Sequence, residues 1–449
     1  MGKSVLDKPM ANLAPLIIGS LWTPYGLSDD PFFQAPLQAG DGSGARPMTL
    51  FVGRDDELRI LANQVVGSMS SRAIVEGAPG VGKTTFVNRL KTELARHGVL
   101  THAESVRITP RMSPRDFVGE VLKALLQMYA TLQAAAGAAG LRQAFRRGTQ
   151  MLQDEVGLDG DVVFWRRISR LIAGEDSVAL GVAGVQRERV GIPAEVKLSL
   201  FDELAEALRR LSGPNGRRVL VHVGNLETLT QADACDAARL MQNVRDVFLA
   251  DWGHWLFVGT TGIADAIFRP TPQVSSIIGA ETQLRPLTPP EVAELLRRRY
   301  RHLHLGKEVA PLIPPLDPDT GAALYARYHG HLRAFLMLAS RAVHIVAPGV
   351  PLGEGDVIDA MAPWYWETLV AQLGIADAER LRVLVGGRAL TTEFRVADIV
   401  RDSAMTQSSA SKLIRRLERV GVIIQTRTEG RSTFYQVRDG DATIALAMR

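Results

Sequence analysis

The sequence is poor in cysteine, because Cys235 is the single one among 449 residues. One thiol excludes an intramolecular disulfide framework and any metal site built from several cysteines, and it fits a reducing cytoplasm. The sequence also has no apolar run near the roughly 18 residues that cross a bilayer. Residues 1–21 lack the layout of a signal peptide and are interpreted as a mobile arm. These absences predict a cytoplasmic protein that has no membrane partner.

Neither sign of charge dominates the sequence. Lysine and arginine number 52 against 48 aspartate and glutamate, which leaves a net charge of +4. This small excess permits a nucleic-acid partner but does not by itself predict one. Hydrophobic residues make up 46% and charged residues 22%, a balance typical of globular proteins. The length suffices for about three domains.

One glycine-rich segment, Gly77–Thr84, carries a recognisable chemistry. It follows a strand-like apolar run at residues 72–76 and precedes a helical pattern at residues 85–98, which is the context of a phosphate-binding P-loop. The glycines let backbone N–H groups point at phosphate oxygens, Lys83 reaches the β- and γ-phosphates, and Thr84 ligates Mg²⁺. The predicted nucleotide contacts are Gly77, Ala78, Pro79, Gly80, Val81, Gly82, Lys83, Thr84 and Thr85.

Strand-like and helical segments alternate around the P-loop. Strands are expected at residues 72–76, 99–108, 218–223, 252–259 and 282–286. This alternation predicts an α/β fold with a parallel sheet and helices on both faces. A long insert at about residues 111–200 separates the second and third strands, with helices expected near 114–134, 141–155 and 162–173 and a β-like stretch at 177–185. A further helix is expected at residues 199–212.

Together with distant segments, the P-loop resembles that of AAA+ ATPases, most closely the origin-recognition and initiator group and its relatives among signalling ATPases. Residues 51–58 are similar to the family's segment that packs against adenine, which implies nucleotide contacts at Val52, Gly53 and Arg54. Residues 287–296 are similar to the entry of the family's helical lid, and Thr288 is the expected N-cap of its first helix. The resemblance implies an N-terminal arm at residues 1–50, a nucleotide-binding domain at 51–287 and a lid at 288–372.

Further positions take their roles from the same resemblance. Gly330-His-Leu-Arg333 is similar to a Gly-x-x-Arg motif whose arginine touches the γ-phosphate. Thr260 or Thr261 resembles the polar residue that orients the attacking water. Arg269 is a candidate for the arginine that such proteins insert into a neighbouring subunit. In many relatives that arginine would be expected where this sequence has Ser276 and Ile277, which puts in doubt whether this chain has such an arginine.

The two acidic residues that the family has directly after its third strand are missing. Gly224 and Asn225 occupy their places, and Glu227 is the nearest carboxylate. An asparagine can hydrogen-bond a water but cannot take its proton or neutralise Mg²⁺, so we expect weak or conditional hydrolysis. The candidate catalytic residues are Lys83, Asn225, Glu227, Thr260 and Arg333.

Residues 373–449 show a pattern of three helices followed by a β-hairpin, which resembles the winged helix-turn-helix domains of MarR-type regulators and initiator ATPases. The second helix is expected at residues 394–401. The third helix is expected from Thr406 to Gly421, with an apolar side formed by Leu413, Leu417 and Val420. In such folds this helix enters the major groove of DNA. The expected contacts are Gln407, Ser408, Ser411 and Lys412 with bases, and Arg415, Arg416, Arg419 and Arg431 with phosphates.

Two functional hypotheses follow from these features. The first is an ATP- and Mg²⁺-binding AAA+-like protein, forming a homo-oligomer or joining a larger assembly, whose nucleotide state controls double-stranded DNA binding or assembly through the winged helix. The second is a signalling or scaffold ATPase in which ATP is a structural ligand and the winged helix docks a protein. DNA-stimulated turnover favours the first, and inert, tightly held nucleotide favours the second.

Overall fold

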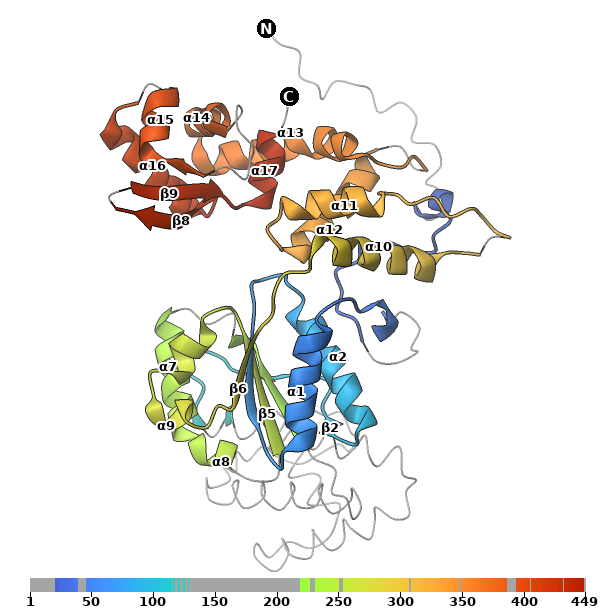
Figure 1. The fold of residues 1–449 in the computed structure, drawn as a ribbon, viewed down its shortest axis with the longest axis vertical. Coiled ribbons are helices and arrows are strands. Elements are labelled where there is room, and N and C mark those ends of the chain that lie inside the picture. Colours follow the sequence, from blue (N-terminus) through green and yellow to red (C-terminus); the bar gives the residue numbers. More distant parts are fainter. Residues whose placement is uncertain are drawn as a thin grey trace, which may run out of the picture. The chain divides into compact units, whose positions relative to one another are not determined.

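The computed structural model describes residues 21–38, 46–114, 219–226, 231–249, 253–306, 308–346, 349–385, 393–403, 405–430 and 432–447, together with some residues between 116 and 128. The chain forms two compact units (Figure 1). The sheet unit comprises Pro36–Met48 and Arg54–Arg285, and the helical unit comprises Met1–Ala35, Thr49–Gly53 and Pro286–Arg449. The insert elements expected at residues 141–155, 162–173, 177–185 and 199–212 lie outside the described residues.

The sheet unit contains a parallel sheet whose strand order is β2-β4-β5-β1-β6, with β3 also paired to β4. All described pairings are parallel, which confirms the predicted α/β fold. The strands are β1 Arg72–Glu76, β2 Leu100–Thr101, β3 Val106–Arg107, β4 Val219–Gly224, β5 Gly253–Gly259 and β6 Ala280–Gln283. The strand expected at residues 99–108 is therefore two short strands, both paired with β4.

Helices cover both faces of this sheet, as Figure 1 shows. Helices α1 (Asp55–Gly67) and α2 (Lys83–Arg96) lie on one side, whereas α7 (Gln231–Asn243), α8 (Arg245–Leu249) and α9 (Pro272–Ser275) lie on the other. Every residue of β4 and β5 is buried, as expected for central parallel strands that are covered on both faces. Phe117, Val121 and Leu125 add to the core on the side of α7 and α8.

The helical unit follows the predicted order of elements. Four helices come first, and the first of them begins at a capping box in which Glu291 binds the backbone N–H and the hydroxyl of Thr288. The helices are α10 Pro289–Leu303, α11 Pro318–Ala326, α12 Leu332–Ile345 and α13 Glu354–Leu373. No helix within the described parts of the chain is both long enough and apolar enough to cross a bilayer.

The C-terminal part of this unit contains the three helices and the hairpin that the sequence predicts. We call Ile375–Val437 the winged-helix segment: α14 Ile375–Val385, β7 Phe394–Arg395, α15 Val396–Ser403, α16 Gln407–Val420, β8 Ile423–Glu429 and β9 Ser432–Val437. Residues 394–395, expected to be helical, instead form a strand antiparallel to β9. A further helix that was not predicted, α17 (Gly440–Leu446), follows the hairpin.

Helix α16 has the expected caps and one expected apolar face. The Thr406 hydroxyl accepts a hydrogen bond from the N–H of Ser409 at 3.2 Å, and Gly421 ends the helix with a φ of 83°. Its buried residues are Ala410, Leu413, Ile414 and Leu417. The assignment of Val420 to the apolar side is wrong, because its side chain is 38% exposed. Val422, which is completely buried just beyond Gly421, fills that end of the core instead.

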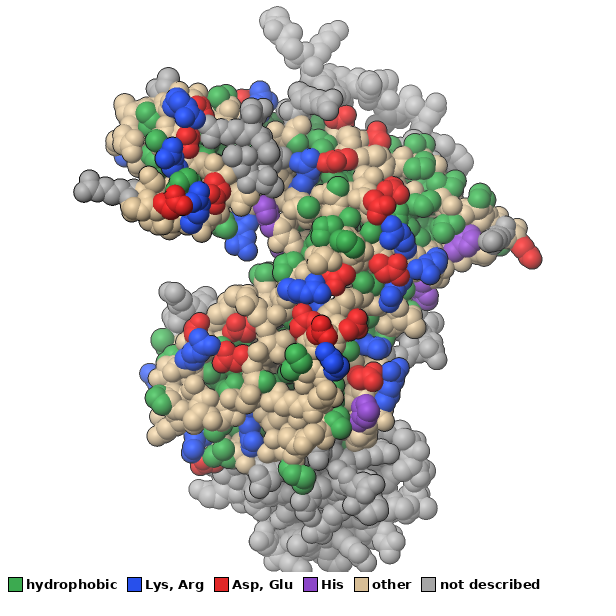
Figure 2. Space-filling view, in the orientation of Figure 1, with side chains coloured by type: hydrophobic (Ala, Val, Ile, Leu, Met, Phe, Trp, Pro, Cys, Tyr) green, Lys and Arg blue, Asp and Glu red, His purple; other side chains and the backbone are tan. Residues whose placement is uncertain are grey.

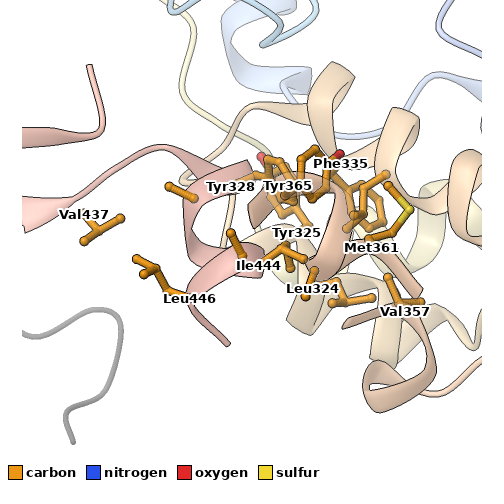
Figure 3. Close-up of a cluster of buried hydrophobic side chains, with 14 of the residues drawn as sticks. Leu324, Tyr325, Tyr328, Phe335, Val357, Met361, Tyr365, Val437, Ile444 and Leu446 are labelled. Carbon is orange, nitrogen blue, oxygen red and sulfur yellow. The ribbon is translucent and has the colours of Figure 1, made fainter. Parts of the chain in front are cut away.

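Helix α17 joins the winged-helix segment to the preceding helices in one hydrophobic core (Figure 3). Ile444 packs among Tyr328, Tyr365 and their neighbours, and the Tyr328 hydroxyl donates a hydrogen bond to Asp441 Oδ1 at 3.0 Å. Burial raises the pKa of Asp441. The tyrosine ring also lies directly on Gly440, where a Cβ would stand only 2.1 Å from Tyr328 Cδ1. The domain boundary expected at residues 372–373 falls within this continuous core.

Residues 21–35, part of the predicted N-terminal arm, are folded onto the helical unit. Trp22, Tyr25 and Phe32 are buried in its core. The guanidinium of Arg299 in α10 donates hydrogen bonds to the carbonyls of Pro31 and Phe33, both at 2.9 Å. This part of the arm is therefore held by buried contacts, whereas residues 1–20 lie outside the described part of the chain.

Candidate functional site

The predicted P-loop is formed between β1 and α2. Strand β1 ends at Glu76 and α2 begins at Lys83, so Gly77–Gly82 makes the turn between them. Gly80 and Gly82 have φ values of 72° and 100°, which favour glycine. A Cβ on Gly77 would stand 2.9 Å from Val81 Cγ1. The turn leads into the N-terminus of α2, where unpaired N–H groups and the helix dipole favour an anion.

The Lys83 side chain folds over this turn. Its ammonium group donates hydrogen bonds to the carbonyls of Gly77 at 2.9 Å and Ala78 at 3.2 Å, and the residue is buried. Thr84 is exposed in the first turn of α2. The Thr85 hydroxyl instead accepts a long hydrogen bond, 3.4 Å, from the N–H of Leu37. Lys83 thus lies against the turn and Thr84 is exposed at the start of α2, and their roles as phosphate and magnesium ligands stay predictions.

Arg54 places a second cation against the P-loop. It lies just before α1 in a left-handed conformation, with a φ of 63°, and it is 5% exposed. Its Nη2 donates hydrogen bonds to the carbonyl of Val81 at 2.6 Å and to that of Arg285 at 3.2 Å. Its Nη1 lies 3.3 Å from where a Cβ of Gly82 would be. A buried guanidinium and an ammonium on one glycine-rich turn suit a polyphosphate.

The ends of β4 and β5 lie at the same edge of the sheet as the P-loop, because the strands are parallel. Asn225, directly after β4, has a φ of 67°, and its Nδ2 is 3.4 Å from the carbonyl of Ile108. Thr260, directly after β5, is half-buried. Neither Gly224, the last residue of β4, nor Asn225 has a carboxylate side chain, and Glu227 lies outside the described residues. The described end of β4 therefore offers an amide where a magnesium site would use carboxylates.

Three predicted site residues belong to the helical unit instead of the sheet unit. They are Val52, Gly53 and Arg333. Gly53 has a φ of 69°, and a Cβ there would stand 2.5 Å from Glu291 Oε1, so the position requires glycine. Arg333 is exposed in the first turn of α12 and makes no ion pair with any described residue. It is free to contact a ligand.

Arg269, the candidate for an arginine acting on a neighbouring subunit, is engaged within its own chain. Its guanidinium pairs with Asp265 and, at 2.8 Å, with Glu281. Two carboxylates neutralise the charge that such an arginine would need, which agrees with the doubt raised by Ser276 and Ile277.

Sequence reasoning did not connect His222 of β4 with Lys91 and His102, and these three titratable groups form a buried cluster. The N–H of His222 donates to His102 Nε2 at 2.8 Å, and the Lys91 ammonium donates to the carbonyl of His102 at 2.7 Å. Burial lowers the pKa of Lys91 to about 8 and that of His102 to about 3, and it also lowers the pKa of His222. Both imidazoles are therefore neutral in the folded chain at neutral pH. No sequence period relates these three positions.

This cluster predicts acid sensitivity. The pKa of His102 is about 3 in the folded chain and about 6.5 when unfolded, so the unfolded state binds more protons between these values. The free energy of unfolding should fall as the pH is lowered from about 6.5 to about 3. Urea midpoints measured across this range should decline less steeply for His102→Gln than for the wild type. Equal slopes for the wild type and His102→Gln would contradict the assignment.

The predicted DNA-contacting residues of α16 lie largely on its exposed side. Ser411 is half-buried, and its hydroxyl donates to the carbonyl of Gln407 at 2.9 Å. Arg416 pairs with Asp377 of α14 at 2.8 Å. The remaining exposed positions are Gln407, Ser408, Lys412, Arg415 and Arg419, whereas Arg431 lies outside the described residues.

The charge of the basic residues on α16 and in the hairpin is thus partly neutralised. Lys412, Arg415 and Arg419 make no ion pair with any described residue, but Arg416 does, and Arg427 in the wing pairs with Glu393 at 2.7 Å. On the face of the molecule that Figure 2 shows, basic and acidic side chains are interspersed. Lys412, Arg415 and Arg419, which pair with no carboxylate in the described part of the chain, are therefore the candidates for phosphate contacts.

Comparisons with known proteins identify the part of the chain that holds the P-loop. The family model of the AAA ATPase domain matches residues 50–249. No protein with curated information matches the sequence.

Solved structures similar to this chain are distant. One is the ORC1 protein of Aeropyrum pernix in complex with DNA, at 18% identity and a TM-score of 0.39, covering 88% of this chain and 92% of that one. Another is the ORC2 protein of the same organism with ADPNP and ADP, at 14% identity and a TM-score of 0.45, covering 93% of this chain and 96% of that one. The Drosophila ORC bound to DNA is similar at 13% identity and a TM-score of 0.41, covering 100% of this chain and 97% of that one.

Proposed function

We propose that this chain binds ATP with Mg²⁺ and that the bound nucleotide controls DNA binding or assembly through the winged-helix segment. The proposal is supported by the match of residues 50–249 to the family model of the AAA ATPase domain. The observation that carries the proposal is the P-loop turn, with Lys83 and Arg54 both bonded to its carbonyls. In the proposed complex the turn and the N-terminus of α2 hold the phosphates. Lys83 exchanges its loop carbonyls for phosphate oxygens, and Thr84 ligates Mg²⁺.

We further propose that nucleotide occupancy, more than rapid turnover, sets the state of the protein. Phosphoryl transfer depends on positioning and charge compensation. Strand β4 ends in Gly224 and is followed by Asn225, neither of which can accept a proton from water. A chain with this strand end should hydrolyse ATP slowly and stay in the ATP state for a long time.

The helical unit could connect the state of the nucleotide to the winged-helix segment. The winged-helix segment shares one core with the helices that carry Arg333. If Arg333 contacts ATP and ADP differently, as the family resemblance implies, any shift of α12 is carried to α16 through this core. The proposed ligand of α16 is the phosphate backbone of duplex DNA, contacted by Lys412, Arg415 and Arg419.

The DNA-binding part of this proposal is tested by charge removal on α16. Arg415→Ala/Arg419→Ala should weaken binding to duplex DNA at least about tenfold and lower the slope of log affinity against log salt by about 2, since each lost phosphate contact releases fewer counterions. Fluorescence anisotropy over a salt series, with ATP present, measures both quantities. Arg416→Ala is the matched control, because Arg416 is already paired with Asp377, and it should change affinity much less.

The second candidate is a scaffold or signalling ATPase whose winged-helix segment docks a protein. It is favoured by the ion pairs that neutralise Arg416 and Arg427 and by the lack of carboxylates at the end of β4. The same samples separate the candidates. The scaffold would be favoured if DNA binding is undetectable or independent of salt, and if the nucleotide stays tightly bound and DNA does not stimulate its hydrolysis. These results would contradict the proposed DNA-binding role.

A further inference from the structure

Glu76 places a carboxylate directly beside the P-loop. It is the last residue of β1, and Gly77 begins the turn. Its Oε2 accepts a hydrogen bond from the N–H of Gly262 at 3.1 Å, and its Oε1 accepts one from the N–H of Ala264 at 2.6 Å. Both donors belong to the segment that follows β5. Two charge-assisted hydrogen bonds therefore tie that segment to the strand that leads into the P-loop.

No other acidic residue lies in the central strands of the sheet. Strands β1, β4 and β5 are described in full, and Glu76 is the one carboxylate among their residues. An isolated carboxylate at a phosphate-binding edge would repel a triphosphate. Here two backbone N–H groups donate one hydrogen bond to each of its oxygens. Glu76 is thus placed to hold the loop that follows β5.

The loop held in this way carries Thr260. Strand pairing sets Gly259 beside Glu76, and the hydrogen bond from Gly262 returns to the same residue. Thr260 and Thr261 are consequently bracketed by two attachments to Glu76. Gly262 has a φ of 88°, which lets the chain turn back toward the carboxylate. The hydroxyl of Thr260 follows the end of β5, at the edge where β1 enters the P-loop.

We propose that Glu76 is a positioning residue that holds Thr260 in place to recognise the terminal phosphate of a nucleoside triphosphate. This role rests on the proposed function, in which the P-loop binds ATP. A diphosphate has no terminal phosphate for Thr260 to contact, so the hydrogen bonds of Glu76 contribute to ATP affinity and not to ADP affinity. Glu76 thereby sets the preference of the chain for ATP over ADP.

The test compares two affinities in the full chain with Mg²⁺ present, using the non-hydrolysable ATP analogue ADPNP and ADP. In Glu76→Gln one carboxylate oxygen becomes an amide NH₂ group. That group is a hydrogen-bond donor, so it cannot accept the hydrogen bond from one of the two backbone N–H groups. Affinity for ADPNP should fall about tenfold, and affinity for ADP should change less than about twofold. Glu281→Gln is the matched control, since that carboxylate lies on neighbouring β6 and pairs with exposed Arg269. Its ratio of affinities should equal that of the wild type.

Two further variants keep the result decisive. Glu76→Asp is too short to reach both donors, so it should reduce the preference as well, even if Glu76→Gln does not fold. Thr260→Ala should reduce the preference, and adding Glu76→Gln to it should bring no further loss, because both act on one contact. Equal losses for both nucleotides, or an unchanged ratio in both Glu76 variants, would overturn the role of Glu76 alone. A wild-type chain that binds neither nucleotide would overturn the proposed function together with it.

Discussion

Replacement of Lys83 by alanine should abolish most nucleotide binding. The ammonium group is bonded to the carbonyls of Gly77 and Ala78 at the turn that would hold the phosphates. In the proposed complex the ammonium group bonds phosphate oxygens instead, and alanine would lose these charge-assisted hydrogen bonds, worth about 1.5–3 kcal/mol each. We expect affinity for ATP to fall by at least about 100-fold, equivalent to about 2.7 kcal/mol. Titration with a fluorescent ATP analogue in the presence of Mg²⁺ measures this loss directly.

Lys412→Ala is the matched control for that measurement. Lys412 is exposed on α16 and makes no ion pair with the described residues, so its removal should leave nucleotide affinity unchanged and reduce affinity for DNA. The pair of variants thus separates the two binding activities. Full nucleotide affinity in Lys83→Ala would show that the P-loop is not the nucleotide site.

Gly440→Ala should destabilise the helical unit strongly. A Cβ at this position would lie 2.1 Å from Tyr328 Cδ1 and 2.4 Å from Cε1. The ring cannot easily move away, because Tyr328 is 3% exposed and its hydroxyl is bonded to Asp441. Overpacking of this kind typically costs about 1–3 kcal/mol. We expect a loss of at least about 2 kcal/mol in the free energy of unfolding, measured from urea midpoints by circular dichroism.

The control is the same substitution at an open position of a helix in the same unit. Gly355 lies in the first turn of α13, and a Cβ there would meet no atom within 4 Å. Gly355→Ala should stabilise the chain by up to about 1 kcal/mol through helix propensity. A small effect of Gly440→Ala, similar in size to that of Gly355→Ala, would mean that α17 is not packed on Tyr328 in solution.

Much of the fold followed from local patterns in the sequence. The strand-turn-helix order around Lys83, the capped start of α10 at Thr288 and the three helices and hairpin of the winged-helix segment were all predicted, and the elements are present. Errors occurred where pairing partners decide the structure. Residues 394–395 pair as a strand with β9, and Val420 is exposed whereas Val422, beyond Gly421, is buried.

The site shows the same division. Motif and spacing sufficed to identify the P-loop residues from Gly77 to Thr84, because that turn is built from consecutive residues whose conformation depends on their own glycines. The hydrogen bonds of Arg54 to Val81 and of Glu76 to Gly262 had no sequence signal. The partners in those contacts are 27 and 186 positions apart, and only the pairing of strands brings the second pair together.

By itself, therefore, the sequence predicted a phosphate-binding turn, a strand at residues 218–223 that no pair of acids directly follows, and a helix near the C-terminus that carries several basic residues. Each of these is a property of neighbouring residues, so it survives without knowledge of the fold. Tertiary structure alone decided which side chains hold the turn, which cations of α16 stay unpaired, and that α17 closes one core over Tyr328. These features depend on contacts between residues far apart in the chain, which no local period encodes.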